Sequence, residues 1–357
     1  MLFEIKLLKY SLIQRYRNFR RSRMSKRIKW IDFGKGITIL LVVIGHVSLG
    51  LFLSNRFNTN ASLLLLLIEI LYVFHMPVFF ALSGYFFKTI NSANEYINLL
   101  KKKFISLGIP YVAFSVIMTI MKKIGGGSVR TPVGITKFIN IYRLPIDHLW
   151  FLYVLFGIFV YLGFLSLYIK NDKILFNISL IGYLIITIFP TDIYLIQRVL
   201  IWSPMFMLGK ILRDVKLKSY ITYITISGYV IYLILWMVFN FKTQISYSTP
   251  GIQGIIFPIS IFFAFSVYSS INENSNFFEY FVKCGRISLP IYLMHAPIAS
   301  IIRIILLKVG VTQVFVQLFI GVIGAWFISI LIFEIIHQIK FLDFFLYPMK
   351  YLKQKSN

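Results

Sequence analysis

The sequence predicts an all-α fold, a polytopic integral membrane bundle of about ten transmembrane helices. Hydrophobic residues make up 58% of the 357 positions and charged residues only 14%, whereas a soluble domain carries about a quarter charged residues. Uncharged apolar runs recur along the chain, and no Asp, Glu, Lys or Arg occurs from Gly36 to Asn55. A helix of about 20 such residues is long enough to cross a bilayer.

Apolar segments with the length and composition of membrane spans follow one another along the chain. One transmembrane domain, 30–340, is expected between a basic amphipathic arm at 1–29 and a basic tail at 341–357. The arm lacks the short apolar core and cleavage site of a signal peptide, so we expect it to lie along the membrane surface. The predicted spans are 31–53, 63–87, 104–121, 149–169, 174–189, 193–212, 220–239, 252–271, 287–307 and 313–338.

The net charge of +25 is distributed as the positive-inside rule requires. Lys and Arg gather in the arm, in the connectors on the same side and in the tail, and they are sparse in the opposite connectors. We therefore expect a multi-pass protein of the cell membrane with both termini in the cytoplasm. The charge suits anionic lipids and does not indicate nucleic acid, and the sequence leaves an oligomer open.

Several kinds of chemistry find no support in the sequence. Cys284 is the single cysteine, so neither a disulfide framework nor a cysteine metal cluster is expected. The chain has no Walker motif, no Gly-rich dinucleotide fingerprint and no His-Glu-x-x-His motif. We therefore predict no metal site and no ATP-driven step.

The first span places three polar side chains on one helix face. At about 100° per residue, Lys35 lies about 20° and Asp32 about 40° from the direction of His46. Lys35 and His46 are roughly 16 Å apart along the helix axis. They cannot touch, but they could line one tunnel at two depths.

Histidines occur at related depths in the first, second and ninth spans, at His46, His75 and His295. Ionisable groups inside spans are costly and usually functional, and a neutral imidazole can act as a base. One such histidine more often only bonds neighbouring helices, but three favour a shared, water-lined passage. Pro77 deprives the Val73 carbonyl of its helical partner, and the resulting kink opens space beside His75.

Three basic side chains are further candidates. Lys103 ends a run of three lysines at the start of the third span, which suits a phosphate-bearing ligand and the positive-inside rule equally well. Arg198 in the sixth span is expected to meet a carboxylate or to line water, and Glu69 is a possible partner. Arg303 in the ninth span is a further ionisable group within a span.

Four other residues are candidates for the site, and two of them also have an ordinary structural interpretation. His148 is expected at the outer boundary, within reach of a polar acceptor. Trp150 also fits an interfacial aromatic belt, and Ser83 also fits close helix packing. Tyr292 lies about one turn from His295, so the two could border the same site.

These segments, taken in order, resemble the membrane acyltransferase-3 family over about residues 28–335. Lys35 stands where the family more often has Arg, and Ser106 where a second Arg is common. The matching segments are Lys35 with His46 eleven positions later, Phe74-His75-Met76-Pro77 through Ser83-Gly84, Lys103 with Ile109-Pro110-Tyr111, His148-Leu149-Trp150-Phe151-Leu152, Arg198 to Gly209, and Ile287-Ser288 to Tyr292 and His295.

The resemblance implies an acyltransferase domain at 30–340. It would move an acyl group, usually acetyl, from acyl-CoA to a hydroxyl of a cell-surface polysaccharide or lipid-linked sugar. Acyl-CoA would be a co-substrate and no cofactor would be permanently bound. His46 would be the general base, with Lys35, His75 and His295 as the other catalytic residues. Substrate contacts would come from Asp32, Ser83, Lys103, His148, Trp150, Arg198 and Tyr292.

Two other functions remain open at this point. A transporter or exporter of a glycan or small solute would also need kinked helices and buried charges. A non-catalytic scaffold would recruit partners through the basic arm. Solute flux without a CoA thioester would favour the transporter, and dependence on residues 1–25 rather than on His46 would favour the scaffold.

Overall fold

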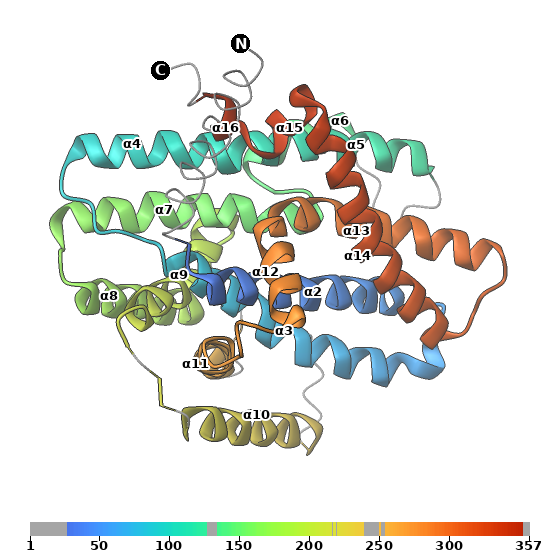
Figure 1. Cartoon of the computed structure of the whole chain (residues 1–357), viewed down its shortest axis with the longest axis horizontal. Helices are drawn as coiled ribbons and strands as arrows, with labels where there is room; N and C mark the ends of the chain where they lie inside the picture. Colours follow the sequence, from blue (N-terminus) through green and yellow to red (C-terminus); the bar gives the residue numbers. More distant parts are fainter. Residues whose placement is uncertain are drawn as a thin grey trace, which may run out of the picture.

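The computed structural model describes residues 27–126, 134–215, 217–218, 220–238, 250 and 254–352, so most of the predicted arm lies outside the described residues. The described chain is helical and contains no strand (Figure 1). The helices, labelled as in Figure 1, are α2 (Lys29–Phe52), α3 (Ala61–Gly84), α4 (Ala93–Lys103), α5 (Ile109–Gly125), α6 (Ile135–Ile139), α7 (Trp150–Tyr168), α8 (Asp172–Ile188), α9 (Tyr194–Leu212), α10 (Tyr220–Val238), α11 (Ile256–Tyr268), α12 (Asn276–Arg286), α13 (Ser288–Lys308), α14 (Val314–Gln338), α15 (Lys340–Leu346) and α16 (Pro348–Leu352).

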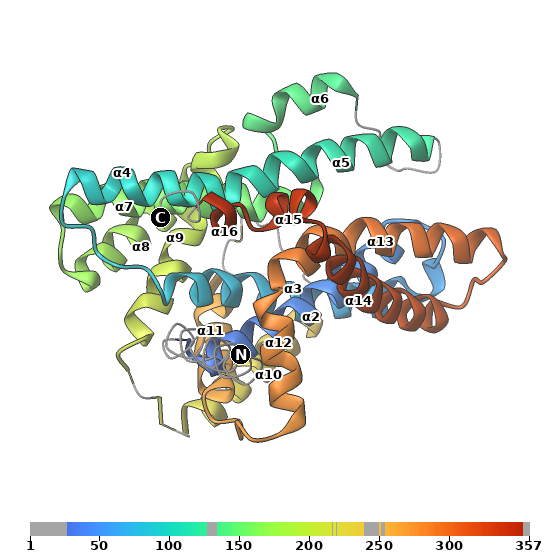
Figure 2. The same cartoon turned by 45° about the horizontal axis from the view of Figure 1, so that its top comes forward.

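The predicted all-α polytopic membrane bundle is confirmed. Eight of the ten predicted spans coincide with helices that are long and apolar enough to cross a membrane. The other two coincide with the shorter helices α8, of 17 residues, and α11, of 13 residues. Helix α2 runs through the middle of the bundle and α10 lies at its edge (Figure 1), while α13 and α14 pack side by side (Figure 2).

Two segments that the sequence predicts to be connectors between spans contain helices. Helix α4 continues through a π-helical turn, Phe104–Gly108, into α5, and α12 packs against α2. The α12 start is capped by Ser275, whose hydroxyl accepts a hydrogen bond from the backbone N–H of Phe278. One face of α12 is apolar, and its Phe278 ring stacks on Phe33 of α2 with centroids 4.9 Å apart. The other face carries charged residues, so the segment does not have the continuous apolar composition of a span.

Glycines allow two helix pairs to approach backbone to backbone. A Cβ atom at Gly36 of α2 would overlap the Phe281 carbonyl of α12. Similarly, a Cβ atom at Gly209 of α9 would overlap the Ala81 carbonyl of α3. Small residues at such crossings are the usual means of close packing in membranes, where van der Waals contact drives helix association.

Substitution of Gly209 by alanine is expected to lower the midpoint of thermal unfolding in detergent. The added methyl must push α9 away from α3, and overpacking of this kind costs about 1–3 kcal/mol. Gly228 of α10 is the matched control, because a Cβ there would meet only the Ile259 side chain at 3.4 Å, an ordinary contact. Both changes gain the same helix propensity, so equal midpoints for the two variants would contradict the close α3–α9 crossing.

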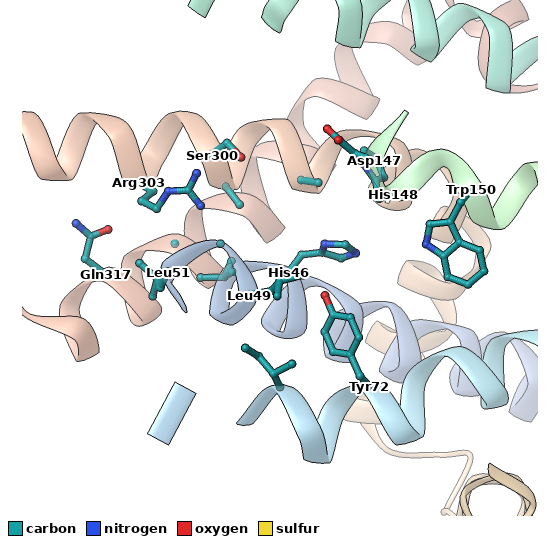
Figure 3. Close-up of a pocket in the computed structure, with 16 residues that line it drawn as sticks. His46, Leu49, Leu51, Tyr72, Asp147, His148, Trp150, Ser300, Arg303 and Gln317 are labelled. Carbon is teal, nitrogen blue, oxygen red and sulfur yellow. The ribbon is translucent and has the colours of Figure 1, made fainter. Parts of the chain in front are cut away.

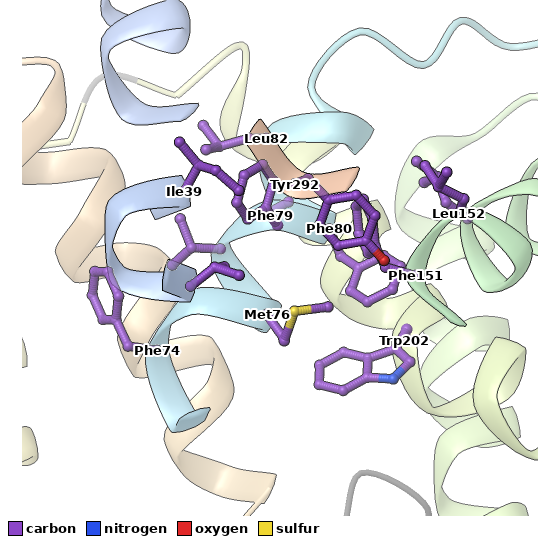
Figure 4. Close-up of a cluster of buried hydrophobic side chains, with 14 of the residues drawn as sticks. Ile39, Phe74, Met76, Phe79, Phe80, Leu82, Phe151, Leu152, Trp202 and Tyr292 are labelled. Atoms are coloured by element: carbon purple, nitrogen blue, oxygen red, sulfur yellow. The ribbon is translucent and has the colours of Figure 1, made fainter. Parts of the chain in front are cut away.

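Aromatic rings fill the centre of the bundle between α3, α7 and α9 (Figure 4). Phe80 of α3 stacks on Trp202 of α9 at 4.9 Å between centroids, and Trp202 stacks on Phe257 of α11 at 5.3 Å. Phe151 of α7 meets Phe80 at 4.8 Å and Tyr292 of α13 at 5.6 Å. This packed layer determines where cavities can form.

The carboxylate of Asp343 fastens α15 and α16 to the end of α14. Its side chain is fully buried and receives hydrogen bonds from His337 Nδ1 at 2.7 Å, Lys350 Nζ at 2.7 Å and Tyr351 Oη at 2.6 Å. Burial alone would raise the pKa of Asp343, but the three bonds outweigh it and hold the pKa below its ordinary value.

Substitution of Asp343 by asparagine is expected to increase amide hydrogen exchange in α15 and α16. Loss of the charge weakens three charge-assisted bonds, each worth about 1.5–3 kcal/mol. Because the folded pKa is below the unfolded value of about 3.9, the wild-type contribution is fully present above about pH 4 and is lost as the pH falls through the folded pKa. Exchange that is unchanged in the variant, or no acid-induced rise in the wild type, would contradict this role.

Candidate active site

Pro77 leaves one backbone carbonyl of α3 without its helical partner, as the sequence predicts. Pro77 lies inside α3, and the Val73 carbonyl that it leaves without a helical partner accepts a hydrogen bond from Ser260 Oγ at 2.8 Å. In the same turn, His75 Nδ1 lies 2.6 Å from the Leu71 carbonyl. This turn therefore joins α3 to α11 and fixes the orientation of the His75 ring.

Pro297 has the same effect in α13. It frees the Leu293 carbonyl, and His148 Nε2 lies 3.3 Å from this oxygen. Tyr292, one residue earlier, donates its hydroxyl hydrogen to the His148 carbonyl. The short turn before α7 is thus held on α13 by two reciprocal contacts, which bring His148 into the interior.

Three imidazoles meet at this point, and we name His46, His148 and His295 the imidazole cluster. The ring centroids are 5.0 Å apart for His46 and His295, 5.3 Å for His148 and His295, and 6.0 Å for His46 and His148. His75 is one ring removed, because Tyr72 lies between it and His46, at 4.7 Å and 6.1 Å. The sequence predicted His75 at the common site, but His148 occupies that place.

Backbone contacts decide which imidazole nitrogens can act as bases. His295 Nδ1 lies 3.0 Å from the Ile291 carbonyl, and a carbonyl can only accept, so in the neutral ring Nδ1 carries the hydrogen. The lone pair then lies on Nε2 of His295 and, by the same reasoning, on Nδ1 of His148. Both atoms are buried and have no hydrogen-bond partner among the described residues. The cluster therefore presents unsatisfied acceptors to a donor such as a hydroxyl.

A cavity of about 380 Å³ opens beside the cluster, and we name it the His46 cavity (Figure 3). His46, His148, Tyr72 and Trp150 line one part of it. Its volume falls within the range of small-molecule sites. His295 packs against the ring of His46 behind this lining, so it can act through His46.

A second cavity, of about 150 Å³, is lined by Lys35, Ser83 and Tyr292, and we name it the Lys35 cavity. Leu107 of the π-helical turn also lines it. The turn precedes Pro110, which has no N–H to continue the regular hydrogen-bond ladder, and π-helical turns are frequent at functional sites. The Lys35 cavity thus brings the two candidate residues Lys35 and Ser83 together beside this π-helical turn.

Tyr292 separates the two cavities. Its ring lines the Lys35 cavity, while its hydroxyl is bound to the carbonyl of His148, which lines the His46 cavity. The sequence predicted one continuous passage. The described residues form two cavities on either side of Tyr292, because bulky rings such as Phe151 fill the space between helices at this level.

The remaining charged candidates near Lys35 have different surroundings. Lys103 lies over the Phe159 ring at 3.9 Å, and its ammonium group is close enough to that of Lys35 for the two to repel each other. Asp32 is within 3.6 Å of Arg286 Nε of α12. Lys103 thus adds charge near the Lys35 cavity, whereas Asp32 joins α2 to α12.

Arg198 of α9 connects to the site through aromatic rings. Its guanidinium lies 5.5 Å from the Trp150 ring centroid and 5.2 Å from that of Tyr194. Cation–π contacts of this kind hold a charged side chain against aromatic surface. Arg198 therefore positions Trp150, which lines the His46 cavity.

Three uncharged polar residues that line the His46 cavity are not among the candidates predicted from the sequence. They are Ser300 of α13 and the buried side chains Tyr72 of α3 and Gln317 of α14. Tyrosines are numerous in this chain, so the sequence gives no reason to single out Tyr72 as a site residue. Gln317, in contrast, interrupts an otherwise apolar run in the last span, and an uncharged polar side chain in such a run is itself a signal of interhelical bonding or a site.

The fold and this site define a polytopic membrane protein with a histidine-lined cavity between its spans. The family model described as "Acyltransferase domain" matches residues 28–334. The chain therefore belongs to the acyltransferase-3 family and is a membrane acyltransferase. No curated protein and no solved structure matches the chain.

Proposed function

We propose that this acyltransferase moves an acetyl group from acetyl-CoA to a hydroxyl of a cell-surface polysaccharide or lipid-linked sugar. The observation that supports this most directly is the imidazole cluster at the wall of the His46 cavity. Acyl transfer to a hydroxyl needs a base that accepts a proton at the reacting oxygen. His46 lines a cavity large enough for a sugar residue, and His295 lies beside its ring.

In this mechanism His46 takes the proton of the acceptor hydroxyl as its oxygen attacks the thioester carbonyl. The new C–O bond gives a tetrahedral intermediate, and the C–S bond then breaks. The imidazolium returns its proton to the departing CoA thiolate, so the ester and free CoA are the products. As the imidazolium forms, His295 Nε2, which has no partner among the described residues, would accept a hydrogen bond from the second nitrogen of His46 and orient that ring, since a catalytic base usually has such a partner.

The donor would enter from the side of Lys35. Lys35 and Lys103 supply positive charge for the phosphates of CoA, and the thioester end of its pantetheine arm would extend through the Lys35 cavity toward Tyr292. The acceptor would occupy the His46 cavity. Rotation of the Tyr292 ring would join the two cavities, and its hydroxyl would then be free to bind the developing oxyanion.

Mass spectrometry of surface glycans from cells with and without the protein tests this proposal. Loss of an acetyl mass from one glycan in the deleted strain is the expected result. The purified protein in liposomes should also move label from acetyl-CoA to that glycan. Unchanged glycans together with no thioester cleavage in liposomes would reject the proposed reaction.

A further inference from the structure

The wall of the His46 cavity beyond His46 includes three polar residues that the mechanism above does not use. Arg303 and Ser300 of α13 and Gln317 of α14 line the cavity at this end (Figure 3). All three lie within helices that are otherwise strongly apolar. Polar side chains that line a cavity within spans are expected to bind something polar.

The position of Arg303 depends on Gly50 of α2. A Cβ atom at Gly50 would lie 2.2 Å from Arg303 Nη1, so only glycine lets the guanidinium rest against the α2 backbone. Gly50 is four residues after His46, which is about one turn or roughly 6 Å along the helix axis. The guanidinium is therefore held about one sugar ring away from the proposed base.

Gln317 is 1% exposed and has an unsatisfied acceptor at the cavity. Its Nε2 donates to the Val311 carbonyl at 2.8 Å, which fixes the orientation of the amide. Its Oε1 is buried and has no hydrogen-bond partner among the described residues. An amide oxygen can only accept, so this atom is suited to a hydroxyl donor.

The guanidinium of Arg303 places positive charge at this end of the cavity. Asp147 lines the same cavity, where its carboxylate lies 2.5 Å from Lys122 Nζ. A guanidinium matches the planar, two-oxygen geometry of a carboxylate or phosphate better than any other side chain. A sugar supplies hydroxyl groups of the kind that Gln317 and Ser300 can bind.

We propose that the acceptor is an acidic sugar, whose carboxylate or phosphate binds Arg303 while one of its hydroxyls reaches His46. This inference rests on the proposed function, because it assigns the acceptor class of that same site. The cavity volume of about 380 Å³ suits a single sugar residue. Arg303 is then the residue that determines which acceptor is acylated.

Binding is measured on the whole protein in phosphatidylcholine nanodiscs, from the ligand-dependent rise in the midpoint of thermal unfolding. The probes are methyl glucuronide, glucose 6-phosphate and methyl glucoside. We expect at least one acidic probe to stabilise the protein and the neutral glycoside to have a much smaller effect. A response to methyl glucuronide alone would assign a carboxylate, and a response to glucose 6-phosphate alone would assign a phosphate.

Substitution of Arg303 by glutamine should weaken binding of the acidic probe at least about tenfold, since bonds to charged groups are worth about 1.5–3 kcal/mol. Gly50→Ala should also weaken this binding, because its methyl displaces the guanidinium from the α2 backbone. This second variant keeps the test available if R303Q does not fold. Lys308→Gln, at the end of the same helix and outside the cavity, should bind as the wild type does. Equal stabilisation by all three probes, or an unchanged response in both R303Q and G50A, would overturn the acidic-sugar site.

Transfer of labelled acetyl from acetyl-CoA, measured on the same preparations, separates the two proposals. Arg303-dependent binding with no acetyl transfer to any probe would reject the proposed reaction and retain the acidic site. Equal transfer to methyl glucoside and methyl glucuronide, unaffected by R303Q, would retain the reaction and reject the acidic acceptor. Loss of the sugar response when the nanodiscs contain phosphatidylglycerol would assign Arg303 to a lipid headgroup and also reject the acidic acceptor.

Discussion

Substitution of His46 by alanine is expected to reduce acetyl transfer by about 10²–10⁴-fold, the usual contribution of a positioned general base. His46 lines the cavity proposed for the acceptor, as His148 also does, and the His46 ring is the closer of the two to His295, at 5.0 Å against 5.3 Å between centroids. The wild-type rate should also fall at acidic pH, because a protonated imidazole cannot accept the hydroxyl proton. The measurement is transfer of label from acetyl-CoA in liposomes.

His337→Gln is the matched control, because it removes an imidazole from the end of α14, where the ring binds Asp343 rather than a cavity. This variant should transfer acetyl at the wild-type rate. The His46 variant should still bind acetyl-CoA, since the donor is proposed to enter from the Lys35 cavity. Near-normal turnover in His46→Ala would remove His46 as the base.

Substitution of His295 by leucine should give the second largest loss, about 10²-fold in kcat. A displacement of the base by about 1 Å is enough for such a loss, and leucine cannot accept a hydrogen bond from the second nitrogen of His46. KM for acetyl-CoA should not change, because His295 is not among the residues that line the Lys35 cavity. Single-turnover kinetics would separate the chemical step from donor binding.

Rescue distinguishes positioning by His295 from a merely structural role. His295→Gln carries an amide oxygen that can accept a hydrogen bond, so it should restore part of kcat that leucine loses. The two variants should have similar unfolding midpoints. Equal kcat values for the leucine and glutamine variants would show that His295 does not orient His46.

Much of the fold is readable from the sequence because one simple pattern determines it. An apolar run that must satisfy its backbone hydrogen bonds in lipid can only be a helix, and each predicted span coincides with one. The loss of a helical hydrogen bond at Pro77 was equally predictable, and the Val73 carbonyl that it frees accepts a hydrogen bond from Ser260. The identity of that donor depends on a helix far along the chain, so no local pattern could supply it.

The candidate site was predictable only in part, for the same reason. Helix periodicity indicates which way His46 points along α2, but not which element packs against it. His148 enters the cluster through a tertiary contact with the carbonyl freed by Pro297. Helix α12 was missed because its charged face conceals an apolar one. Pairwise packing between distant segments is therefore what the sequence does not reveal.

The single tyrosine between the two cavities has a consequence for the bilayer itself. A reaction that joins a reactant from each side of a membrane would normally require an open pore, and an open pore would leak protons and dissipate the membrane potential. Here the Tyr292 ring and the neighbouring aromatic side chains close the route at the level of the imidazoles. Under the proposed function, an acetyl group could cross while the ion gradients that sustain the cell stay intact.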